Sequence, residues 1–148
     1  MGGGRSEPLS PSDVLAEAGP CVPAVVSLLR RAGREASPND AHAPATASGF
    51  ALIDTGASST SVDEKAVQEL GQPSVDVARI ASALEPSAVR SVYPISISLE
   101  GLPFPFIVPR AIGAELRSQG LLVLLGRDVL QYCTLFYNGL TGQITLAI

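Results

Sequence analysis

Alternation of apolar and polar side chains over residues 93–99 is the feature that most constrains the fold of this chain. Apolar side chains occupy every second position there, at Tyr93, Ile95, Ile97 and Leu99. This period of two is typical of a half-buried β-strand. The segments around it, "VDVARIAS" and "VRSVYPISISL", are short and are separated by turn residues, which predicts a long hairpin with its tip near residues 84–87. The chain is therefore predicted to be mainly β.

Short apolar segments later in the chain also predict strands and turns. Residues 102–109 are expected to be extended, because each proline disfavours helix at the residue before it. Residues 121–126 are interpreted as a buried strand and residues 127–133 as a short helix. Residues 134–148 are interpreted as a hairpin that turns around residues 138–142.

The first third of the chain has weaker patterns. Residues 1–18 are expected to be flexible or partly helical, with a short helix that Ser12 caps and Gly19 ends. Residues 21–29, "CVPAVVSLL", are read as a strand because of their β-branched residues, although their apolar positions also fit one face of a helix. Residues 33–48, which include His42, predict a long surface loop. One folded domain over residues 19–148 is expected from the length.

Charge and composition argue against several classes of function. The formal net charge is −4 and no cluster of Lys and Arg is present, so nucleic acid is not an expected partner. The longest apolar runs, such as "LLVLL", fall short of the ~20 residues that cross a bilayer, so no membrane partner is expected. The first residues do not resemble a secretion signal, which favours a cytoplasmic protein, although Gly2 and Ser6 match a permissive myristoylation pattern.

Cysteine and histidine are scarce. Two cysteines and one histidine are too few for the usual zinc sites, so we expect neither a metal nor another cofactor. Cys21 and Cys133 are expected to be free thiols, and a disulfide between them is the alternative. The excess of Arg over Lys, with abundant Ala, Gly and Pro, is associated with bacterial sequences.

The stretch "ALIDTGASST", residues 51–60, places Asp54 directly after a short apolar strand over residues 50–53. Ser61 and Glu64 have the spacing of a capping box, which predicts a helix that Gly71 ends. Asp54 then lies on a tight turn between strand and helix, where Gly56 is expected to permit a backbone shape that a side chain would forbid. Two interpretations are open: Asp54 caps its own turn, or its carboxylate carries out chemistry.

Two motifs in this order resemble those of the retropepsin-like aspartic proteases. "LIDTGASST" is similar to the catalytic loop of that family, and "LLGRDVL" is similar to its second motif, with a hairpin between them in the place of the family's flap. The resemblance covers about residues 20–148 and is closer to the cellular and bacterial branch than to the viral enzymes. It implies a mainly β fold: a closed β-barrel that forms half of an acid protease, with a flap hairpin and two or three short helices.

The resemblance also implies an activity and a set of site residues. Aspartic proteolysis needs two carboxylates that share one proton, and this chain has a single Asp-Thr-Gly. The second carboxylate is therefore expected from Asp54 of the partner subunit in a homodimer that hydrolyses a peptide or protein substrate. The implied roles are catalysis for Asp54; support for Thr55, Gly56 and Ala57, with Thr55 linking the two loops; the second motif for Leu124, Leu125, Gly126 and Arg127; and the flap for Ala83, Leu84 and Glu85. Residues 143–148 are implied at the dimer interface.

The chain departs from the viral pattern at two places. Ser58 stands where viral members have an acid that pairs with the arginine of the second motif, so Arg127 is expected to bond a hydroxyl, a backbone carbonyl or Asp128 instead. The segment "SALEPS" lacks the glycines of viral flaps.

Other functions compete with proteolysis. The main alternative is a dimeric peptide-binding or assembly module with the same fold and little turnover. A serine or cysteine hydrolase is disfavoured because "GASST" does not match the nucleophile elbow. Phosphoryl transfer is disfavoured because no phosphate-binding glycine-rich loop is present.

Overall fold

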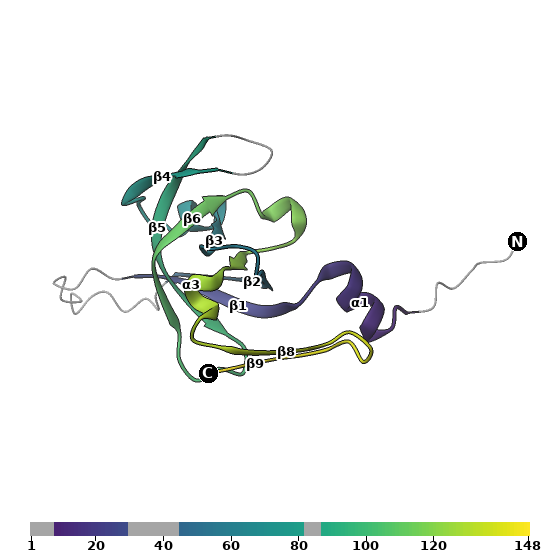
Figure 1. Ribbon diagram of the computed structural model, residues 1–148. Helices are drawn as coiled ribbons and strands as arrows, with labels where there is room; N and C mark the ends of the chain where they lie inside the picture. The colour runs from purple at the N-terminus through teal and green to yellow at the C-terminus, as the bar shows by residue number, and fades with distance from the viewer. Residues whose placement is uncertain (1–7, 30–44, 82–86) are drawn as a thin grey trace, which may run out of the picture.

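The fold is known from a computed structural model, which describes residues 8–29, 45–81 and 87–148 (Figure 1). Several sequence-based expectations lie outside these residues. They are the flap positions Ala83, Leu84 and Glu85, the histidine His42, most of the predicted loop over residues 33–48, and the myristoylation pattern at Gly2 and Ser6.

Six strands close into a barrel. The strands follow one another around the barrel in the order β1-β2-β7-β3-β6-β5, and β5 pairs back to β1. Their bounds are β1 Cys21–Leu28, β2 Thr46–Ile53, β3 Ser61–Asp63, β5 Ala88–Leu99, β6 Phe106–Ala114 and β7 Val123–Leu125. The structure thus confirms the prediction of a mainly β fold with a closed barrel. Residues 21–29 fitted either a strand or a helix in the sequence. The structure shows a strand, because β1 pairs with β2 on one side and with β5 on the other.

One hairpin extends from the barrel. Strand β4, Asp76–Ile80, pairs antiparallel with the first part of β5 and has no second strand partner among the described residues. Figure 1 shows the two strands projecting from one end of the barrel. The arms of the predicted hairpin are thus confirmed, whereas its role as a flap stays a prediction.

The barrel interior is filled by aliphatic side chains, as the lack of Trp requires. Val26, Val62, Ile95, Ile97, Val123 and Leu125 are fully buried. Burying an aliphatic side chain of this size contributes about 1.5–3 kcal/mol relative to leaving it in water. Strand β7 lies between β2, to which it is parallel, and β3, to which it is antiparallel. The Asp-Thr-Gly motif follows β2 and the second motif includes β7, so the two motifs lie at the ends of neighbouring parallel strands.

The described helices are short: α1 Pro11–Ala18, α2 Glu64–Glu69, α3 Arg127–Leu130 and the 3₁₀-helix η1 Arg117–Gln119. None of them is long and apolar enough to cross a membrane. The expected cap of α1 was wrong. Ser10, not Ser12, accepts the N–H of Asp13 at 3.2 Å, and the Asp13 carboxylate accepts the Ser10 N–H, so that Pro11 begins the helix. Gly19 ends it, as predicted.

The capping box predicted for α2 was also wrong. Ser61 belongs to β3, and the cap is Asp63, whose Oδ2 accepts the N–H of Ala66 at 3.0 Å. The predicted stop is confirmed, because Gly71 has a φ of 81° and donates to the carbonyl of Gln68 at 2.9 Å.

The C-terminal strands form a separate hairpin, as predicted, from β8 Thr134–Asn138 and β9 Gln143–Ala147. Its inner side chains Leu135, Ile144 and Leu146 pack against the barrel core. Helix α1 lies beside its turn (Figure 1), where Gly142 has a φ of 70° and passes so close to the Pro11 backbone that a side chain would not fit. Whether β9 also pairs with a second chain stays a prediction.

Candidate functional site

Asp54 lies at the first position after β2, half-buried, with its backbone fixed to the neighbouring strand. Its N–H donates to the carbonyl of Leu125 at 3.0 Å. Its carboxylate oxygen Oδ1 accepts the N–H groups of Gly56 at 2.8 Å and Ala57 at 3.2 Å. In the described part of the chain, Oδ2 accepts no hydrogen bond from another residue. The loop therefore orients the carboxylate through one oxygen and leaves the other available to a ligand.

Gly56 suits this turn for a reason other than the predicted one. Its φ is not positive, unlike that of five other glycines, so the expected special backbone shape is wrong. A Cβ at this position would lie 3.1 Å from Oδ1 of Asp54, closer than ordinary van der Waals contact. Glycine thus lets the backbone approach and bond the carboxylate. Thr55 is exposed and Ala57 is half-buried in the same turn, so the structure brings the predicted support residues together around Asp54.

Arg127 joins the second motif to the Asp54 loop. Its guanidinium nitrogen Nη1 donates to the carbonyls of Thr55 at 2.8 Å and Gly56 at 2.9 Å. Its backbone N–H donates to the carbonyl of Ala57 at 2.9 Å. Of the three kinds of partner expected for Arg127, the structure selects the backbone carbonyl.

Thr60 and Asp128 form a second link that the sequence analysis did not identify. The Thr60 side chain is fully buried, and its hydroxyl donates to Oδ1 of Asp128 at 2.7 Å. The Thr60 N–H donates to Oδ2 of Asp128 at 3.0 Å. The Thr60 hydroxyl in turn accepts the N–H of Gly126 at 3.0 Å. The two residues are 68 positions apart, and no local sequence pattern indicates their contact.

Gly126 makes this close approach possible. A Cβ there would lie 2.5 Å from the carbonyl carbon of Ser59, a backbone atom that cannot move aside as a side chain can. The two loops are thus in backbone contact and cross-linked by Arg127 and by Thr60. The two motifs are therefore neighbours in the structure.

A partly exposed apolar surface adjoins Asp54. Side chains alternate along a strand, so Leu52 and Asp54 point away from the core residues Ala51 and Ile53. The strand pairings continue this surface from Leu52 to Leu124, and then across β3, β6 and β5. We call it the Asp54 face, made of Leu52, Asp54, Ser61, Ile112 and Leu124; Val92 of β5, which is paired with Ile112, is buried at the edge of this face.

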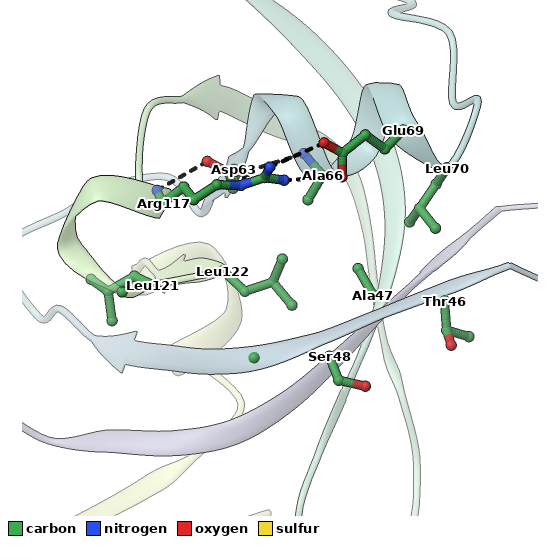
Figure 2. Close-up of a pocket in the computed structure, with 12 residues that line it drawn as sticks. Thr46, Ala47, Ser48, Asp63, Ala66, Glu69, Leu70, Arg117, Leu121 and Leu122 are labelled. Atoms are coloured by element: carbon green, nitrogen blue, oxygen red, sulfur yellow. Dashed lines mark hydrogen bonds and ion pairs between the residues drawn. The ribbon is translucent and has the colours of Figure 1, made fainter.

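A cavity in the described part of the chain lies elsewhere. It has a volume of about 510 Å³ and is enclosed by the start of β2, α2, η1 and the segment before β7. Asp54 does not line it. Figure 2 shows Arg117 reaching toward Asp63 and Glu69 above Leu121 and Leu122.

The charged groups of this cavity are already paired. Asp63 is 2% exposed, and its carboxylate accepts N–H groups from Ala66, Leu116 and Arg117 and pairs with the Arg117 guanidinium at 3.3 Å. Arg117 also binds both carboxylate oxygens of Glu69, at 3.0 and 3.1 Å. This hydrogen bond and the Arg117 charge lower the pKa of Glu69, and the hydrogen bond with Glu69 raises the pKa of Arg117. The cluster holds α2 and η1 together, and each charged side chain among the described residues that line the cavity is paired.

Cys21 and Cys133 are free thiols, as expected. Burial raises the pKa of each thiol, which keeps both protonated at neutral pH. Neither thiol is therefore an activated nucleophile.

No protein-family model matches the chain, and no curated protein matches it. Inference about function therefore rests on the geometry of the Asp54 loop and of the face beside it.

Proposed function

We propose that this chain is one half of an aspartic endopeptidase, in which Asp54 and Asp54 of the partner subunit activate a water molecule. One observation carries the proposal. The Asp54 carboxylate is held through Oδ1 by two backbone N–H groups, while Oδ2 has no partner among the described residues. A carboxylate that only capped its turn would have no need of the two cross-links that tie this loop to the second motif.

The requirement for a second subunit follows from the chemistry. Two carboxylates that share one proton are needed, and within the described residues no hydrogen bond joins Asp54 to another carboxylate. Asp128 is engaged by Thr60, and Asp63 by Arg117. A twofold axis beside Asp54 would bring two copies of this loop together with a single site between them. The exposed Thr55 is then in position to bond the opposite loop.

The reaction uses each carboxylate in a different protonation state. The ionised carboxylate takes a proton from water, whose oxygen bonds to the scissile carbonyl carbon, while the protonated carboxyl donates to the carbonyl oxygen. The tetrahedral intermediate then collapses: the carboxyl that took the proton from water passes it to the amine nitrogen as the C–N bond breaks, and the other carboxylate recovers its proton from the intermediate's hydroxyl group. No bond forms between enzyme and substrate.

The Asp54 face indicates the kind of substrate. Leu52, Leu124 and Ile112 are half-buried in the single chain and provide apolar contacts beside the carboxylate. An extended peptide satisfies its backbone by pairing with strand edges and places alternate side chains against such a surface. We therefore propose peptides with apolar residues at the scissile bond.

A dimeric peptide-binding module remains the second candidate, because Oδ1 of Asp54 also stabilises its own turn. Such a protein would keep the same loop without turnover.

The variant Asp54→Asn separates the two candidates. Asparagine keeps an oxygen that accepts the Gly56 and Ala57 N–H groups, so folding should be retained. Cleavage of a diverse peptide mixture should fall by at least about a hundredfold, because proton transfer by the dyad is lost. Sedimentation should show the same dimer for both proteins. Unchanged cleavage by the variant would contradict the peptidase proposal, and peptide binding without cleavage by either protein would favour the module.

A further inference from the structure

Arg90 lies on the β4–β5 hairpin, on the same side of the sheet as the Asp54 face. Val92 is buried at the edge of that face, where it is paired with Ile112 of β6. Arg90 is two positions before Val92 on β5, and Ala78 of β4 is paired with it. Because side chains alternate along a strand, residues 90 and 92 project to the same side. Arg90, which is exposed, therefore projects to the same side of the sheet as the Asp54 face, beyond the buried Val92.

The other side of the hairpin provides a natural comparison. Arg79 is paired with Val89, and both are one position out of phase with the Ala78–Arg90 pair. Their side chains therefore point away from the Asp54 face, and both are exposed. Two arginines of one hairpin thus differ in the face that they occupy.

The charge of Arg90 is not neutralised by the described part of the chain. The nearby acid Asp76 is paired with Val92 in the sheet, but its carboxylate forms a salt bridge with Arg110 at 2.8 Å. This contact lowers the pKa of Asp76, chiefly through the hydrogen bond from Arg110. Among the described residues, no carboxylate lies within salt-bridge distance of Arg90.

We propose that Arg90 selects peptides that carry Glu or Asp close to the scissile bond. The inference rests on the peptidase proposed above. Arg90 projects to the same side of the sheet as the Asp54 face, from the hairpin beyond Ile112, so the acid is expected at a position away from the scissile bond and not at the bond itself. Arginine suits this role because its planar group binds both oxygens of a carboxylate.

The effect should be moderate in size. Exposed ion pairs contribute little, but a pair held between peptide and hairpin is better shielded from water. We expect Glu to be preferred over Gln at one or two adjacent positions by about three- to tenfold in kcat/KM. The preference should decrease as salt is added.

The test uses decapeptides with two central leucines and a single Glu, Gln or Lys placed in turn at each other position. Arg90→Gln should abolish the preference for Glu over Gln, and Arg90→Glu should shift it toward Lys. The matched control Arg79→Gln, on the opposite face, should keep the preference. Loss of the preference in both variants, or its absence in the unmodified protein, would overturn the assignment to Arg90.

Binding of the same peptides to the Asp54→Asn protein makes the two proposals independent. If no peptide is cleaved by the unmodified protein, the peptidase proposal fails. Tighter binding of Glu than of Gln peptides that depends on Arg90 and not on Arg79 would still support the selectivity, and equal binding would reject it.

Discussion

Replacing Thr60 with valine tests the junction between the two loops most selectively. Valine has nearly the shape of threonine, so the change removes a hydroxyl without creating a cavity. Two hydrogen bonds are lost, one to the Asp128 carboxylate at 2.7 Å and one from the Gly126 N–H at 3.0 Å. The Thr60 side chain is fully buried, so water cannot replace either partner.

The expected loss follows from these two contacts. A hydrogen bond to a charged group contributes about 1.5–3 kcal/mol, and an unpaired buried N–H costs about 1–3 kcal/mol. Because Asp128 still accepts the N–H of Val129 at 3.0 Å, the two effects overlap. We expect Thr60→Val to lower the free energy of unfolding by about 3 kcal/mol. Thr60→Ser keeps the hydroxyl and loses one methyl group, which should cost about 1 kcal/mol.

Urea unfolding followed by circular dichroism measures both variants. All proteins should be compared at one concentration, because dimerisation stabilises the folded state by mass action. The reasoning is refuted if Thr60→Val is no less stable than Thr60→Ser.

Two further predictions concern backbone contact and pH. Gly126→Ala should destabilise the fold by about 1–3 kcal/mol through overpacking, because its Cβ would lie 2.5 Å from the Ser59 backbone. Gly139→Ala is the control and should be close to neutral in the same urea assay, because the nearest atom to its Cβ is 3.5 Å away. The pKa of Glu69 is held below its ordinary value of 4.5 by Arg117, so this pair stabilises the fold above that pH and ceases to do so as the pH falls through the lower, folded pKa. Between pH 6 and about pH 3, the Glu69→Gln protein should therefore lose less stability in thermal unfolding than the unmodified protein. An identical loss in the two proteins would contradict the role of the Glu69–Arg117 pair.

The elements that the sequence predicted well are those with strong local signals. Alternation over residues 93–99 identified β5, and glycine marked the ends of α1 and α2. The two motifs that the family resemblance picked out lie on the neighbouring strands β2 and β7.

The features that were missed depend on contacts between distant residues. Ser61 has the local pattern of a helix cap, but pairing with β6 and β7 draws it into a strand and leaves the cap to Asp63. Thr60 and Asp128 are 68 positions apart, and no local pattern joins them. Gly56 illustrates a different limit, because its role depends on the position of the Asp54 carboxylate and not on its own φ.

Mixing the unmodified protein with Asp54→Asn tests most directly whether two subunits share one site. A fixed amount of unmodified protein is equilibrated with increasing Asp54→Asn, and cleavage of a peptide substrate is measured. If the subunits pair at random and two Asp54 residues are needed, an equal amount of variant should reduce activity to about one half, and a ninefold excess to about one tenth. Activity that stays constant while mixed dimers form would show that each chain acts alone and would contradict the shared site.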